Sequence, residues 1–159
     1  MKQNSGNRWI ILIASIVCNL CIGAAYAWSV FQRPLINMFK WTPSEASLAF
    51  TLSLAMMPIA MTIAGKIQDK QGPKKVMIIG GIMFGLGVIA TGFTTSLMYL
   101  YLVYGVIGGL GIGAVYSCAI ANTVKWFPDK KGLASGLIAA GLGMGAVVFA
   151  PIGTYLIQS

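Results

Sequence analysis

The fold is decided by residues 76–124, VMIIGGIMFGLGVIATGFTTSLMYLYLVYGVIGGLGIGAVYSCAIANTV, a run of 49 residues without Asp, Glu, Lys or Arg. A hydrocarbon core of about 30 Å needs roughly 20 helical residues. The run therefore holds two crossings, and the polar residues Thr94, Thr95 and Ser96 mark the turn between them. A membrane-embedded helical hairpin is the first prediction.

Three more charge-free runs lie outside this hairpin, at residues 9–32, 46–65 and 132–159. Each is long enough for one crossing. The sequence therefore predicts an all-α membrane protein with five transmembrane helices. The predicted helices cover about 9–32, 46–65, 76–93, 99–124 and 133–157.

The composition agrees, because 57% of the residues are apolar and only 9% are charged. A soluble domain is nearer 45–50% apolar and about 25% charged, so a soluble globular protein is excluded. The net charge of +8 would favour nucleic-acid binding only on a folded module with a basic face. Here the basic residues lie in short loops, so the expected partner is the lipid bilayer and not a nucleic acid.

The distribution of Lys and Arg predicts the orientation. With a cytoplasmic N-terminus, the loops on that side carry nine basic residues against two on the other side, Arg33 and Lys40. Positive residues prefer the cytoplasmic side. The nine are Lys2, Arg8, Lys66, Lys70, Lys74, Lys75, Lys125, Lys130 and Lys131. We expect a multi-pass protein of the cell membrane, with the bacterial inner membrane as the favoured location.

Local signals refine the helices. Thr42, Pro43 and Glu45 have the spacing of an N-cap, a first helical position and a capping-box acid. Pro58 is predicted to kink the second helix. Glycine pairs four residues apart predict close packing among 76–93, 99–124 and 133–157. These pairs are Gly81 and Gly85, Gly105 and Gly109, Gly109 and Gly113, and Gly141 and Gly145.

The segment GKIQDKQGPKK at 65–75 resembles the signature G-x-x-x-D-(R/K)-x-G-x-(R/K)-(R/K) of the major facilitator superfamily. A basic turn that only follows the positive-inside rule explains the lysines, but not Gly65, Asp69 and Gly72 at these offsets. The matching residues are Gly65, Asp69, Lys70, Gly72, Lys74 and Lys75. The resemblance implies a cytoplasmic gating loop that latches the two halves of a transporter together.

Each residue of this loop has an expected physical role. Gly65 allows a helix to approach closely, and Gly72 permits a tight turn. Asp69 can lie against the positive N-terminal end of a neighbouring helix and accept its free amides.

Two further segments, GAAYAWSVFQRPL at 23–35 and KWFPDKKGLASG at 125–136, resemble the oxalate/formate antiporter and monocarboxylate transporter families. This resemblance implies secondary transport of a small organic anion, a mono- or dicarboxylate, by alternating access. The spans contain no ionisable Asp, Glu, His, Lys or Arg, the groups from which proton relays are built. Exchange or facilitated passage is therefore favoured over proton symport.

Polar residues of the first helix share one stripe. At 100° per residue they fall within about 40° of one line, which should face a cavity or protein because polar groups facing lipid are costly. The stripe consists of Ser15, Asn19, Tyr26, Ser29 and Arg33. Trp28 is predicted on the opposite side, as a packing or interfacial residue.

We take Asn19, Tyr26, Tyr116 and Arg33 as candidates for lining a substrate cavity. Tyr26 offers a carboxylate an apolar wall and a hydroxyl donor. Asn19 fits equally well a hydrogen bond between helices. Tyr116 shares a helix face with Gly105 and Gly109, so helix packing is an equal alternative. No metal site, cofactor or enzymatic nucleophile is expected.

A superfamily transporter is built from two six-helix halves. Five helices cannot complete one half, so the sequence suggests an amino-terminal fragment, a truncated product or one piece of a split transporter. The missing carboxy-terminal helices would belong to the same chain or to a partner chain. Two alternatives stay open: a non-transporting membrane subunit, and a carrier for another solute.

Overall fold

The computed structural model describes residues 5–158, so Lys2, one of the basic residues used for the orientation, lies outside them. The described part is helical, without a strand. Five helices are long and apolar enough to cross a membrane, which confirms the predicted number. They run Arg8–Phe39, Pro43–Gln71, Pro73–Thr91, Leu97–Trp126 and Lys131–Ile157.

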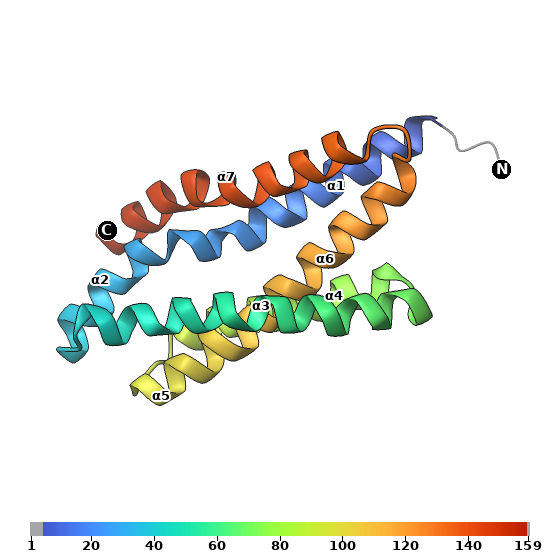
Figure 1. Cartoon of the computed structure of the whole chain (residues 1–159). Helices are drawn as coiled ribbons and strands as arrows, with labels where there is room; N and C mark the ends of the chain where they lie inside the picture. Colours follow the sequence, from blue (N-terminus) through green and yellow to red (C-terminus); the bar gives the residue numbers. More distant parts are fainter. Residues whose placement is uncertain (1–4, 159) are drawn as a thin grey trace.

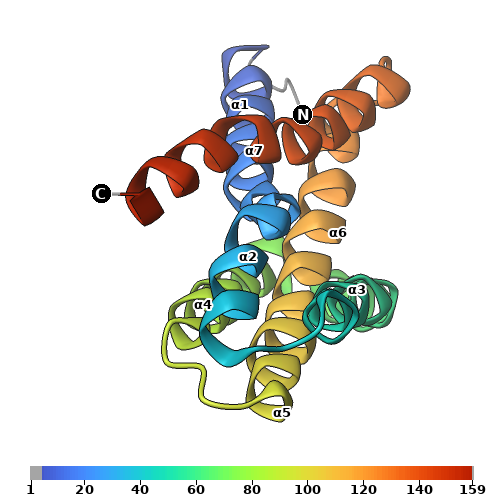
Figure 2. The same cartoon turned by 90° about the vertical axis from the view of Figure 1, so that its left-hand side faces the viewer.

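Figures 1 and 2 show how the spans pack: the first lies alongside the fifth, and the fourth crosses obliquely beside the second and third. One end of the bundle carries segment 65–75, the start of α1 and residues 126–131; we call it the motif end. The opposite end carries residues 39–43 and 92–97. In Figure 1 the motif end is on the right.

The first span is not one continuous α-helix. It consists of α1 (Ser5–Ile22), the 3₁₀ segment η1 (Gly23–Ala27) and α2 (Trp28–Phe39). A 3₁₀ helix turns about 120° per residue, against about 100° for an α-helix. The five residues of η1 therefore rotate α2 relative to a straight α-helix. This rotation decides which side chains of the first span are buried.

The second and third spans are α3 (Pro43–Gln71) and α4 (Pro73–Thr91). The predicted start of α3 is confirmed: Thr42 Oγ1 accepts from the Glu45 amide at 3.3 Å, and Glu45 Oε2 accepts from the Thr42 amide at 2.8 Å. Pro58 lies inside α3, which stays helical on both sides of it.

The fourth span begins with α5 (Leu97–Leu100), widens into the π-helical η2 (Tyr101–Gly108) and continues as α6 (Gly109–Trp126). The fifth span is α7 (Lys131–Gln158). Several spans extend beyond the charge-free runs because helical hydrogen bonding continues through the charged residues at the membrane surface, such as Arg33 in α2 and Lys66 in α3.

Glycines set the closest helix contacts, but their partners differ in part from the prediction. The third and fourth spans do meet closely, since a Cβ on Gly111 would lie 2.7 Å from the Gly80 carbonyl oxygen. The predicted pair Gly81 and Gly85 takes no part in this contact, because a Cβ on either meets nothing within 4 Å in the described residues. The predicted glycines Gly105, Gly109 and Gly113 pack against the second span instead. In α7, however, Gly145 packs against the first span: its Cβ would lie 2.5 Å from the Gly23 Cα. Glycine spacing shows how closely a partner helix approaches, but does not identify that partner.

Candidate functional site

Segment 65–75 forms the end of α3, a one-residue turn and the start of α4. Gly72 makes the turn with φ +84° and ψ 159°, a conformation essentially limited to glycine. Its amide donates to the Gln68 carbonyl at 2.8 Å, which closes the end of α3. The tight turn expected at Gly72 is thus present, and Lys70, Lys74 and Lys75 are exposed around it.

Asp69 points toward the fourth span. Its carboxylate lies 3.9 Å from Lys125 Nζ, with 72% of the Asp69 side chain and 66% of the Lys125 side chain exposed. The expected contact with a helix N-terminus is not made in the described part of the chain, where Asp69 meets Lys125 in the last turn of α6 instead. An exposed ion pair of this kind contributes about 1 kcal/mol or less to stability.

Gly65 has open space beside it. A Cβ built there meets nothing within 4 Å in the described residues. The close helix approach expected at Gly65 is therefore not made by any of the five spans, unlike the contacts of Gly23 or Gly109.

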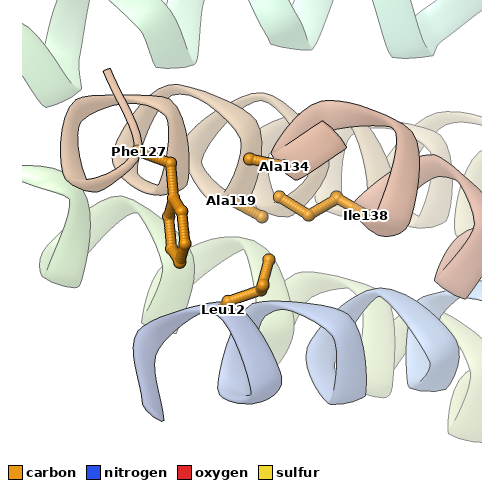
Figure 3. Close-up of a cluster of buried hydrophobic side chains, with 5 residues drawn as sticks. All are labelled: Leu12, Ala119, Phe127, Ala134 and Ile138. Carbon is orange, nitrogen blue, oxygen red and sulfur yellow. The ribbon is translucent and has the colours of Figure 1, made fainter. Parts of the chain in front are cut away.

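A second charged contact at the motif end was missed in the sequence. Arg8 of α1 lies 3.7 Å from the Asp129 carboxylate and 5.1 Å above the Phe127 ring centre. Phe127 is 2% exposed and also packs edge-to-face with Trp9 at 5.5 Å. Figure 3 shows it in a cluster of α1, α6 and α7 residues: Leu12, Ala119, Phe127, Ala134 and Ile138. The sequence signal was the chain break at 126–129.

The predicted polar stripe divides at η1. Asn19 is fully buried and donates to the Ser15 carbonyl of its own helix at 2.8 Å. The contact between helices comes instead from Thr123 of α6, whose hydroxyl donates to Ser15 Oγ at 3.1 Å. Asn19 therefore lies inside the bundle, without access to an open face.

Tyr26, from η1, has a different position. Its side chain is 39% exposed and its ring packs edge-to-face on Phe50 of α3 at 5.8 Å. Within the described residues its hydroxyl makes no hydrogen bond of its own, so it is available to a ligand. Tyr26 thus combines the exposed aromatic wall and the free donor that its sequence position suggested.

Trp28 shows the effect of the 3₁₀ rotation. It is 4% exposed and packs on Tyr104 of η2, with ring centres 4.3 Å apart. The Tyr104 hydroxyl donates to the Ala25 carbonyl at 3.0 Å and holds η1 against the fourth span. The prediction that Trp28 lies on the side opposite the inward-facing stripe was wrong, because it assumed a straight α-helix. Its expected role as a packing residue agrees with its burial.

Tyr116 of α6 is partly buried and packs against two clusters of buried residues. One cluster includes Ile22 and Ala25, which precede Tyr26 in the chain. Helix packing is thus a role of Tyr116, whose side chain is partly buried.

Arg33 is exposed near the opposite end, on the face of α2 that turns toward α7. It lines an open groove of about 580 Å³ together with polar side chains of both helices. The residues around this groove are Ser29, Val30, Arg33, Pro34, Asn37, Thr154 and Ile157. Arg33 and Tyr26 therefore belong to different surfaces of the first span.

These features define an integral, multi-pass membrane protein of the α-helical class, with glycine-mediated helix contacts and charges gathered at the helix ends. The Major Facilitator Superfamily model matches residues 9–159. The chain belongs to this superfamily, as segment 65–75 predicted.

Several curated proteins are similar to this chain over most of its length. An uncharacterised transporter of this superfamily from Escherichia coli, YhjX, is 36% identical over 96% of the chain. The oxalate:formate antiporter of Oxalobacter formigenes is 35% identical over 92% of it, and mouse monocarboxylate transporter 1 is 34% identical over 94%. The chain spans 38%, 35% and 30% of the lengths of these three relatives.

Proposed function

We propose that the chain supplies part of a secondary transporter that carries a small organic anion, a mono- or dicarboxylate, by alternating access. The similarity to an oxalate:formate antiporter and a monocarboxylate transporter over more than nine tenths of the chain carries this proposal. The half-exposed Tyr26, with its free hydroxyl, supports it as a surface on which a carboxylate can bind.

In this proposal the motif end faces the cytoplasm, which agrees with the nine-to-two distribution of basic residues. Segment 65–75 acts as the gating loop. Its exposed Asp69 and the open space beside Gly65 are the surfaces that the remaining helices would contact when the cytoplasmic side closes. Those helices belong to the same chain or to a partner chain.

A chimera tests the function. Residues 1–159 replace the matching segment of the oxalate:formate antiporter, and the chimera is reconstituted into liposomes loaded with formate. We expect uptake of labelled oxalate that depends on internal formate. The unmodified antiporter is the positive control, and empty liposomes give the background.

A monodisperse, membrane-inserted chimera that exchanges no carboxylate would contradict the proposal and favour a non-transporting subunit. Exchange of a sugar or another neutral solute in place of oxalate would favour a different substrate class. The unmodified chain is measured in parallel, because transport by residues 1–159 alone would show that no further helices are needed.

A further inference from the structure

The groove between α2 and α7 holds an arginine without an anionic partner. The ion pairs of the described residues join Arg8 to Asp129 and Lys125 to Asp69, both at the motif end. At the opposite end, the acid nearest to Arg33 in the sequence is Glu45. Its carboxylate accepts hydrogen bonds from the Thr42 amide and hydroxyl in the capping box of α3. The guanidinium of Arg33 therefore faces the groove with its charge unbalanced.

Two further hydrogen-bond donors lie beside it. Ser29 and Asn37 stand four residues before and after Arg33 in the same helix, so all three share one face, about 6 Å apart along the axis. Both side chains are exposed, and neither has a hydrogen-bond partner in the described part of the chain. The groove thus presents a row of donors: a hydroxyl, a guanidinium and an amide.

The neighbouring side chains make their hydrogen bonds and contacts elsewhere and do not cover this row of donors. Gln32 donates to the Ser47 hydroxyl at 2.8 Å and to the Pro43 carbonyl at 2.9 Å, which holds its side of α2 against α3. On the α7 side, Gly153 packs against Phe31 and Val30 and lets the two helices meet at the base of the groove. The Thr154 hydroxyl already donates to the Ala150 carbonyl at 2.9 Å, so it adds no donor.

We infer that this groove is a capture site for small carboxylates at the end of the bundle opposite the motif. A guanidinium binds a carboxylate through two parallel hydrogen bonds. A dicarboxylate can place its second carboxyl group on Ser29 or Asn37, so oxalate binds more tightly than formate. The site lies seven residues, about 10 Å, from Tyr26 along the helix axis, on a different surface of the first span.

This inference rests on the proposed transport of organic anions for its biological use, but the binding is measured separately. The 159-residue chain is inserted into phosphatidylcholine nanodiscs and titrated with ¹³C-labelled oxalate and formate. Arg33→Gln is expected to weaken oxalate binding about tenfold or more, and Arg33→Lys by less, because the charge remains and the planar fork is lost.

A matched variant controls for charge. Lys40→Gln removes the other cation of this end, which does not line the groove, and is expected to keep the parent affinity. Circular dichroism and thermal unfolding verify that each variant is folded.

The inference is overturned if the parent shows no saturable oxalate binding, if Arg33→Gln binds as tightly as the parent, or if Lys40→Gln weakens binding equally. A lipid phosphate is the competing anion, so the titration is repeated with phosphatidylglycerol in the nanodisc. Arg33-dependent retention of that lipid without oxalate binding would assign the guanidinium to the lipid. Groove binding without exchange by the chimera would instead remove only the transport proposal.

Discussion

At the scale of single residues, Gly72 shows why the loop between α3 and α4 needs a glycine. Its φ of +84° with ψ of 159° lies where a Cβ collides with the backbone. A Cβ there would meet no neighbouring side chain within 4 Å in the described residues, so the constraint is conformational and not steric packing. The backbone conformation of the turn therefore explains why this position of the motif is a glycine.

Gly72→Ala is expected to lower the free energy of unfolding by about 1–3 kcal/mol, because alanine is strained in this conformation. Unfolding of the detergent-solubilised chain by SDS measures the change. Gly81→Ala is the control: Gly81 lies inside α4 with ordinary helical φ and open space beside it. Equal stability of the Gly72→Ala variant and the parent would refute the strain.

Tyr26 permits a test of the proposed substrate surface. Tyr26→Ala is expected to raise the half-saturating oxalate concentration of the chimera about tenfold, since a hydrogen bond to a charged group is lost. Tyr26→Phe keeps the ring contact with Phe50 and isolates the hydroxyl. Tyr101→Phe, whose hydroxyl donates to the Glu45 carbonyl, is the matched control. Unchanged affinity in Tyr26→Ala would exclude Tyr26 from the cavity.

At the scale of elements, glycines allow the backbone of α7 to pack directly against the backbone of α1 and η1. Gly145 lies against the Gly23 backbone and the Leu20 carbonyl, both at 2.5 Å from a Cβ placed on it. Without a hydrophobic drive between helices in lipid, such close backbone packing is a main source of helix association.

The element-scale prediction uses two glycines of the same helix. Gly145→Ala is expected to push α7 away from η1 and to cost about 1–3 kcal/mol of unfolding free energy. Gly143→Ala, two residues earlier, meets open space and should be neutral or slightly stabilising. The same SDS titration compares them. If Gly145→Ala lowered the unfolding free energy no more than Gly143→Ala, the close contact of α7 with η1 would not contribute to stability.

At the scale of the whole molecule, two exposed ion pairs join separate spans at the motif end. Arg8 and Asp129 connect α1 to the start of α7, and Asp69 and Lys125 connect α3 to α6. Both pairs are at least partly exposed, so neither is a major source of stability. Asp69 also belongs to the superfamily motif, whereas Asp129 does not. The two acids therefore allow the proposed gating role of Asp69 to be tested against a structural one.

Asp69→Asn is expected to slow oxalate exchange by the chimera severalfold while its unfolding free energy changes by about 1 kcal/mol or less. Asp129→Asn removes the comparable pair and should leave exchange near the parent rate. Exchange in proteoliposomes and SDS unfolding are measured on the same preparations. If both substitutions slow exchange equally, the slower exchange results from the loss of a surface charge and not from a specific role of Asp69 in the proposed gating loop.

Much of the architecture was predictable because the bilayer imposes simple length and polarity rules. The five spans follow from charge-free runs, and the capping box of α3 follows from Thr42, Pro43 and Glu45. The burial of Asn19 was one of two alternatives that the stripe left open. The burial of Trp28 was not predictable, because the 3₁₀ segment before it breaks the helical period that the stripe assumed. The spacing of Gly141 and Gly145 predicted that α7 makes a close helix contact. It did not predict that the partner is the first span.

The sequence by itself determined the number of spans, the turn at Gly72 and the superfamily, because each depends on local chemistry: apolar length, glycine conformation and residue spacing along one loop. Tertiary structure alone decided that Tyr26 and Arg33 lie on different surfaces, that Asp69 meets Lys125, and that α7 packs on the first span. These outcomes depend on helix rotation and neighbour choice, which a one-dimensional pattern does not contain.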